Sequence, residues 1–324
     1  MIAYRPTPAS PPAATQVDWR RVGLFLLIAV GGTWVVGLAL AALLPVVGVT
    51  VVRVLMAVLY MPMPLVAGLV VELTAGRRPL LVVRTLRHLK ADARRLGGIV
   101  ARGVLPALTI TLVAVLLTVV AAAAGLPGAG RVMTTSQELA AALSEVVGVP
   151  IPDDVTLPPP WVLAAISVVQ GVVAGATLNA LLAFGEEYGW RGVLAEELAP
   201  LGRWRAHTLI GSVWGLWHAP AIIWLGLNYR GDWALGIPAM VAMCIPLGFV
   251  LAWAAERSGV FAAAIGHGVV NGTVGIVYYL VADGSPFVVP PGMIFVVVAA
   301  LVAFGLWTTR SRTAAASAAQ SAKP

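Results

Sequence analysis

The chain has 324 residues, of which 60% are hydrophobic and only 11% are charged, and its mean hydropathy is +0.92. Soluble domains carry roughly 45–50% apolar and about 25% charged residues, so this composition excludes a soluble globular protein. The formal net charge of +7 does not indicate nucleic-acid binding, because the basic residues lie between apolar segments, where they report membrane orientation. The single cysteine, Cys244, excludes a disulfide framework and a cysteine-based metal cluster.

Apolar runs of about 20 residues recur along the chain from Val22 to Trp307. Each run is long enough to cross a hydrocarbon core of about 30 Å as an α-helix. These runs predict an all-α, polytopic membrane helical bundle of about eight transmembrane helices. The predicted spans cover residues 22–45, 51–73, 103–125, 161–185, 206–226, 233–254, 259–281 and 289–308.

The two ends of the chain differ in composition from the bundle, which is predicted to occupy residues 22–309. Residues 1–21 are rich in Pro and Ala and residues 310–324 in Ala and Ser, so both are predicted to be disordered. If both termini are cytoplasmic, 17 of the 21 Lys and Arg residues face the cytoplasm. Because cytoplasmic loops carry the excess of Lys and Arg, we predict a multi-pass protein of the cytoplasmic (inner) membrane in this orientation. Residues 79–96, which include His88, are predicted to form a basic amphipathic helix on the cytoplasmic surface.

Polar and ionisable side chains interrupt three of the predicted helices. They are Glu186, Glu187 and Arg191 at the end of the fourth span, His218 in the fifth, and His267 and Asn271 in the seventh. A charge at the bilayer centre costs roughly 2.5–3.5 kcal/mol, so such residues normally face a protein cavity and are functional candidates. The catalytic core is therefore predicted within about residues 161–281.

The spacing of these residues predicts how they meet. Glu187 and Arg191 are four residues apart with the acid first, the order that favours an ion pair within a helix, and this pairing leaves Glu186 free. His267 and Asn271 are also four residues apart and share a helix face. All three motifs lie at a comparable depth from the basic, cytoplasmic segments. We therefore expect the cavity to open toward the cytoplasm.

Pairs of glycines four residues apart occur on the same three helices and predict close helix packing. The pairs are Gly171/Gly175, Gly185/Gly189, Gly211/Gly215 and Gly268/Gly272. We expect the fourth, fifth and seventh helices to form a tight core around the polar cavity.

Two carboxylates, two imidazoles and an amide in a low-dielectric pocket are suited to hydrolysis of an amide bond by water. The carboxylate serves as a general base, and His and Asn donate hydrogen bonds to a developing oxyanion. A zinc site made of Glu186, His218 and His267 is an open alternative, because two His and one Glu form hydrolytic zinc sites, although the helical H-E-x-x-H motif is absent. The cofactor prediction is therefore Zn²⁺ or none.

The three motifs occur in the order Glu186-Glu187-x-x-x-Arg191, Trp214-x-x-x-His218 and His267-x-x-x-Asn271. This arrangement resembles the signature of the CPBP (CAAX protease and bacteriocin-processing) family of intramembrane endopeptidases, which includes the type II CAAX prenyl endopeptidases. The resemblance covers roughly residues 161–281, and Trp214 stands where the family usually has Phe.

The resemblance implies an intramembrane peptidase, a hydrolase that cleaves a membrane-associated or lipid-modified peptide or protein. It implies that Glu186 activates a water with help from His218. It further implies that His267 and Asn271 stabilise the oxyanion, and that Glu187 and Arg191 organise the site. The family is described both as metalloproteases and as glutamate-dependent proteases, so the resemblance leaves the metal open.

Two other classes of function also suit intramembrane polar residues. A transporter or proton relay places Glu, His and Asn in a membrane, but the polar residues here crowd into three spans and form no inverted repeat. A non-catalytic immunity or scaffold protein that retains the motifs is the third possibility. The predicted partners are a peptide or membrane-protein substrate and the lipid bilayer, with no nucleic acid, and the sequence sets no oligomeric state.

Overall fold

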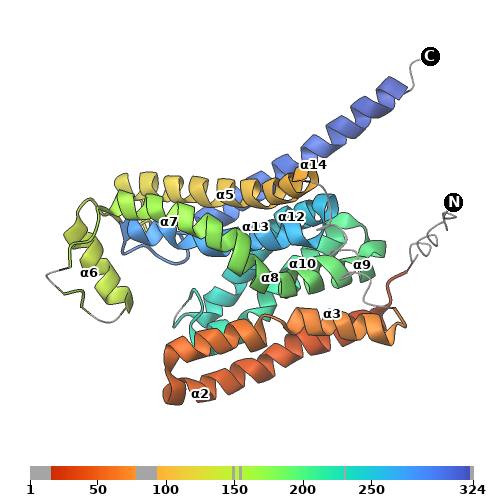
Figure 1. Ribbon diagram of the computed structural model, residues 1–324, viewed down its shortest axis with the longest axis horizontal. Coiled ribbons are helices and arrows are strands. Elements are labelled where there is room, and N and C mark those ends of the chain that lie inside the picture. The colour runs from red at the N-terminus through yellow and green to blue at the C-terminus, as the bar shows by residue number, and fades with distance from the viewer. Residues whose placement is uncertain (1–15, 78–92, 148–149, 153–154, 230, 322–324) are drawn as a thin grey trace.

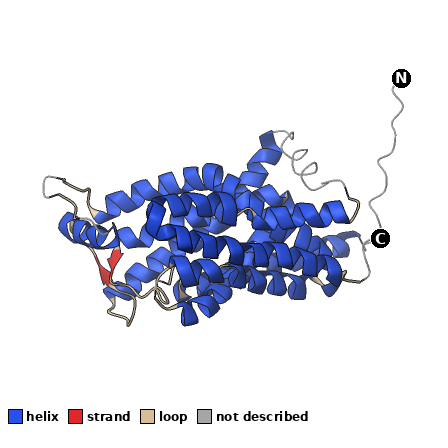
Figure 2. Cartoon of the chain, turned by 90° about the horizontal axis from the view of Figure 1, so that it is seen from below, coloured by secondary structure: helices blue, strands red, loops and turns tan. Residues whose placement is uncertain are grey.

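The computed structural model describes residues 16–77, 93–147, 150–152, 155–229 and 231–321. Most residues in these ranges are helical, and the long helices run along one common axis (Figures 1 and 2). Within the described ranges six helices are long and apolar enough to cross a membrane, and Met293–Thr309 is a shorter apolar helix. The predicted all-α, polytopic membrane bundle is confirmed.

The first long helical segment, Trp19–Thr74, is a hairpin rather than a single rod. It consists of α1 (Trp19–Leu26), η1 (Leu27–Gly31), α2 (Gly32–Leu55), η2 (Met56–Tyr60) and α3 (Met63–Thr74). The chain reverses at Gly48, whose φ of 80° and ψ of 166° suit a residue without a Cβ. The two arms pack against each other through α1 and α3 (Figure 1). They correspond to the predicted spans 22–45 and 51–73, so the hairpin accounts for two passes of the described chain.

The fourth predicted span is longer in the structure than in the sequence analysis. It comprises α7 (Pro160–Ala174), η3 (Gly175–Asn179), α8 (Ala180–Glu187), η4 (Tyr188–Val193) and α9 (Leu194–Glu197). The predicted end at residue 185 is wrong. Hydropathy treats Glu186, Glu187 and Arg191 as the edge of the membrane, whereas in the fold all three are buried. Because Glu187 and Arg191 pair with each other, the helix continues past them without contact with water.

The remaining helices follow the predicted order. They are α5 (Ala93–Ala123), η5 (Ala199–Leu201), α10 (Arg203–Trp217), α11 (Ala219–Leu225), α12 (Trp233–Ser258), α13 (Val260–Thr273), η6 (Val274–Tyr279) and α14 (Met293–Ser321). α14 is helical to Ser321, so the predicted disorder of residues 310–321 is wrong, and the alanines of this stretch favour a helix. α1 likewise begins at Trp19, inside the predicted disordered N-terminus. Residues 1–15, and the predicted surface helix up to residue 92, lie outside the described residues.

The bundle has two distinct ends. At one end β1 (Arg131–Val132) pairs antiparallel with β2 (Val281–Ala282), beside α6 (Ser136–Val147), and we call this the ribbon end (Figure 2). α1 begins and α9 and α12 end at the opposite end, which we call the basic end (Figure 1). The described arginines of the basic end include Arg20, Arg21, Arg77, Arg102, Arg203, Arg205 and Arg257.

Glycines bring the backbones of α7, η3 and α13 into direct contact. A Cβ on Gly171 would overlap the carbonyl oxygen of Gly272, and a Cβ on Gly268 would overlap that of Gly175. The predicted packing of the fourth helix on the seventh is therefore observed.

The fifth helix uses its glycines differently from the prediction. Gly211 and Gly215 of α10 face the backbone of α12 at Ile245 and Val241, so this pair packs the fifth helix on the sixth. The predicted tight core of the fourth, fifth and seventh helices is to that extent wrong, because spacing on one helix does not name the helix that it contacts.

Candidate active site

A buried ionic cluster joins the first and third motifs. Glu187 Oε1 accepts a hydrogen bond from Arg191 Nη1 at 3.0 Å, as the spacing predicts, and also faces His267 Nδ1 at 2.9 Å. Glu187 is 0% exposed and Arg191 7% exposed. Because a carboxylate only accepts, the Nδ1 atom of His267 carries the hydrogen, and its Nε2 is left for the cavity. Glu187 and Arg191 therefore position His267 from behind.

Glu186 points away from this pair, as the spacing predicts, and meets the second motif. Its Oε2 accepts a hydrogen bond from the indole Nε1 of Trp214 at 2.9 Å. The Arg191 guanidinium lies over the ring of the same tryptophan, 4.2 Å from its centroid, in a cation–π contact. Trp214 thus links Glu186 to the ionic cluster, and a phenylalanine at this position would lack the indole donor.

His218 lies at the junction of α10 and α11. Pro220 at the start of α11 lacks a backbone N–H, which favours an interruption of the helix at this point. His218 Nδ1 is 2.8 Å from the carbonyl oxygen of Trp214, so this nitrogen also carries the hydrogen and Nε2 faces away from the helix. The rings of Trp214 and His218 are 5.7 Å apart between centroids, so the two side chains of the second motif lie side by side.

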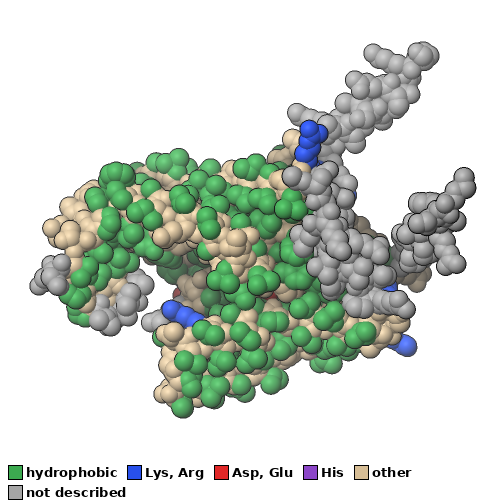
Figure 3. Space-filling view, viewed as in Figure 1, with side chains coloured by type: hydrophobic (Ala, Val, Ile, Leu, Met, Phe, Trp, Pro, Cys, Tyr) green, Lys and Arg blue, Asp and Glu red, His purple; other side chains and the backbone are tan. Residues whose placement is uncertain are grey.

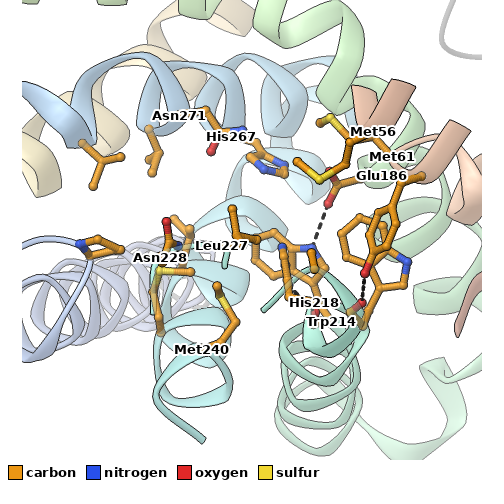
Figure 4. A pocket seen from close by; sticks show the side chains of 18 residues that line it. Met56, Met61, Glu186, Trp214, His218, Leu227, Asn228, Met240, His267 and Asn271 are labelled. Atoms are coloured by element: carbon orange, nitrogen blue, oxygen red, sulfur yellow. Dashed lines mark hydrogen bonds between the residues drawn. The ribbon is translucent and has the colours of Figure 1, made fainter. Parts of the chain in front are cut away.

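The motifs meet at one cavity of about 290 Å³ (Figure 4). Its polar lining includes Glu186, Trp214, His218, His267, Asn271 and Asn228. Its apolar lining includes four methionines, Met56, Met61, Met240 and Met243. Of the predicted site residues, four line the cavity, while Glu187 and Arg191 lie behind it.

The cavity extends toward the ribbon end. Its lining includes Leu227 and Asn228, from the loop between α11 and α12, and Pro291, from the segment before α14, all of which lie at the ribbon end. Figure 3 shows the surface hollowed between the α2–α3 hairpin and the helices above it. The sequence predicts an opening toward the basic segments, and this prediction is wrong. Depth along three helices does not reveal which ends of the other helices form the rim.

The part of the rim formed by Leu227 and Asn228 is held in place by Tyr229. Its ring stacks on Phe287, with centroids 5.3 Å apart, and lies against Gly236, where a Cβ would be only 2.6 Å from the Tyr229 Cβ. Burial raises the pKa of Tyr229 to about 12, so its hydroxyl stays neutral. The loop that carries Asn228 is therefore fixed by packing.

The predicted zinc ligands line the same cavity but do not form a ligand set in this structure. Both imidazoles present Nε2 and bond through Nδ1, which is how metal-bound histidines are usually oriented. Among the described residues, however, no group of three His, Cys, Asp or Glu side chains lies close enough to hold one ion. Glu186, His218 and His267 are thus oriented toward the cavity without the convergence that Zn²⁺ requires.

Two polar contacts near the site involve residues outside the three motifs. Tyr188, next to Glu187, donates a hydrogen bond to the buried carboxylate of Glu72 on α3. Tyr60 donates to the carbonyl oxygen of Trp217. Both contacts attach the N-terminal hairpin to the motif helices. The sequence signal was Glu72 itself, an acid inside the apolar segment of α3.

Comparison with known proteins agrees with the three-motif resemblance. Residues 160–273 match a family model described as "Type II CAAX prenyl endopeptidase Rce1-like". A curated protein of Methanococcus maripaludis, CAAX prenyl protease 2, is 26% identical to this chain over 141 residues, which are 38% of this chain and 47% of that protein. The chain thus spans about half the length of this curated relative. The matched segment contains all the predicted site residues, and the resemblance to a CAAX-protease-like family is confirmed.

Proposed function

We propose that this chain, whose residues 160–273 carry a domain of a CAAX-protease-like family, is an intramembrane endopeptidase. The observation that carries the proposal is the position of Glu186, a carboxylate 2% exposed that lines a cavity together with two imidazoles. A buried acid in a membrane helix is costly, so such a residue is usually either paired or functional. Glu187 has such a partner in Arg191, whereas Glu186 faces the cavity.

Glu186 acts as the general base in this proposal. The indole of Trp214 holds Oε2, and the other oxygen is directed to a water molecule in the cavity. The carboxylate takes a proton from this water as the water oxygen attacks the carbonyl carbon of the scissile peptide bond. The proton then passes to the leaving amine. Such a positioned base contributes roughly 10²–10⁴ to the rate of a proton-transfer step.

His267 and Asn271 stabilise the tetrahedral oxyanion. Because His267 Nδ1 faces Glu187, a hydrogen bond from Nε2 to the oxyanion requires the imidazolium form. The charges support this form: Glu186 and Glu187 contribute two negative charges and Arg191 one positive, so a protonated His267 makes the buried cluster neutral. The Asn271 amide donates a second hydrogen bond from the same helix.

His218 supports the attacking water from the opposite side of the cavity. Its Nδ1 is held by the Trp214 carbonyl, so Nε2 is available to accept a hydrogen bond from the water or from the leaving group. The neutral imidazole thereby orients the water toward the peptide bond.

The proposed substrate is a peptide or protein associated with the membrane, including a lipid-modified one. The curated relative is named as a prenyl protease, and the methionine-lined part of the cavity offers flexible apolar contacts to a hydrophobic segment. We further propose that the chain resides in the cytoplasmic membrane with both termini inside, supported by the concentration of arginines at the basic end.

The experiment that tests this function compares the termini of membrane peptides in cells that express the wild type, Glu186→Gln or Glu145→Gln. Glu145 lies on α6, does not line the cavity, and is the matched control. We expect peptide termini that appear with the wild type and the control but not with Glu186→Gln. Identical peptide termini in all three strains would contradict the protease and favour the transporter or scaffold alternatives.

A further inference from the structure

The cavity is closed toward the basic end of the bundle. Trp217 lines the cavity, and behind it Trp190 and Phe25 are fully buried. The Phe25 and Trp190 ring centroids are 5.3 Å apart, and those of Trp190 and Trp217 are 6.2 Å apart. A separate hollow at the basic end, lined by Arg191, Arg203 and Glu256 among others, shares no lining residue with the cavity. Packed aromatic rings thus separate Glu186 from the basic end.

The cavity is open in the opposite direction. Met56 lies in η2, shortly after the chain reverses at Gly48 at the ribbon end, and Val274 begins η6, which leads into β2. Asn228, in the rim loop, is exposed and also lines the cavity. Glu186 and His267, by contrast, are buried at the inner part (Figure 4). A substrate therefore reaches Glu186 from the ribbon end.

Charge identifies the side of the membrane on which the ribbon end lies. Its described ionisable residues include the acids Glu138, Glu145, Asp232 and Asp283 and the bases Arg53 and Arg131. The basic end carries most of the described arginines. Because Lys and Arg are enriched in cytoplasmic segments, the basic end is cytoplasmic and the ribbon end faces away from the cytoplasm.

We infer that the site receives its substrate from the non-cytoplasmic face, and that this substrate is an exported, membrane-anchored peptide. The choice of substrate class rests on the proposed protease function, whereas the direction of access rests on the cavity and the charges alone. The cavity has a volume of only about 290 Å³ and runs from two exposed amides, Asn228 and Asn271, to the buried carboxylate of Glu186. It therefore suits the end of an extended segment rather than a folded domain.

Cysteine labelling tests the direction of access. Met56→Cys places a thiol in the cavity. Val58→Cys on the same turn is the matched control, because Val58 is 60% exposed and does not line the cavity, so we expect it to face lipid. Ala199→Cys reports the basic end, where Ala199 is exposed. The native Cys244 is buried, and the wild type measures its background. The probe is a small, charged, membrane-impermeant methanethiosulfonate, applied to right-side-out and to inverted vesicles and read as a mass shift.

We expect Met56→Cys to react in right-side-out vesicles at least about tenfold faster than Val58→Cys, because a charged reagent is excluded from hydrocarbon but enters a water-filled cavity. Ala199→Cys should react only in inverted vesicles. Reaction of Met56→Cys only in inverted vesicles, or no faster than Val58→Cys, would overturn the inference. Val274→Cys, across the cavity on η6, repeats the test if Met56→Cys is not produced. Labelling needs no proteolysis, so a protein that labels as expected but cleaves nothing refutes the protease function and leaves the direction of access intact.

Discussion

Replacing Glu187 by Gln is expected to destabilise the protein strongly, although it changes almost no volume. The carboxylate neutralises Arg191 at 3.0 Å and holds His267 at 2.9 Å, and the Glu187 and Arg191 side chains are 0% and 1% exposed. Removing one partner of a buried ion pair leaves an uncompensated charge and costs about 3–5 kcal/mol. At roughly 2–4 °C per kcal/mol, the apparent melting temperature should fall by about 6–20 °C.

Glu186→Gln is the matched control for this prediction. The amide oxygen of Gln still accepts the hydrogen bond from Trp214. Arg191 keeps its direct ion pair with Glu187, and His267 balances the lost charge by releasing its proton, so the melting temperature should shift by no more than about 2 °C. The measurement is the fraction of purified protein that stays monodisperse in detergent after heating through a series of temperatures. If Glu187→Gln is as stable as the wild type, or if both variants lose the same stability, the assignment of Glu187 to the ionic cluster is refuted.

Three further outcomes are expected. Gly268→Ala should lower the thermal stability, because the added Cβ would overlap the Gly175 carbonyl oxygen. Gly275→Ala is the control, because its Cβ would meet nothing within 4 Å. Equal stability of the two variants would contradict the glycine packing. Hydrogen bonds from the backbone amides of Thr134 and Thr135 hold the pKa of Glu138 below its usual range. The first turn of α6 should therefore be protected from hydrogen exchange at neutral pH, and it should lose this protection as pH falls through the lowered pKa. Glu138→Gln should abolish that pH dependence, and an unchanged profile in this variant would refute the cap. Dialysis against a strong chelator should leave peptidase activity within about twofold, and reversible loss restored by Zn²⁺ would instead support the zinc site predicted from the sequence.

The spacing of residues along single helices was sufficient to predict several contacts of the candidate site. Glu187 and Arg191, four residues apart, form the predicted ion pair. Glu186 points away from them toward the cavity. These features depend on local helix geometry, which the sequence reveals directly, and the resemblance of the three motifs supplied their order on three helices.

Contacts between helices could not be predicted in this way. The hydrogen bond from Trp214 to Glu186 and that from Tyr188 to Glu72 join residues distant in the sequence. The direction of the cavity depends on Met56 and on the rim loop, which none of the motifs contains. The fourth helix continues beyond the end predicted from hydropathy because Glu187 and Arg191 pair with each other inside the protein. A hydropathy scale scores each charged residue separately and takes no account of such a pair.

The most direct test of the central claim is the rate at which purified Glu186→Gln protein, reconstituted in lipid, cleaves a peptide identified by the comparison of membrane termini. With folding confirmed by its unchanged melting temperature, the variant should cleave about 10²–10⁴ times more slowly than the wild type, because the base is lost while the indole contact remains. A rate above roughly one tenth of the wild-type rate would contradict the role of Glu186 as the general base.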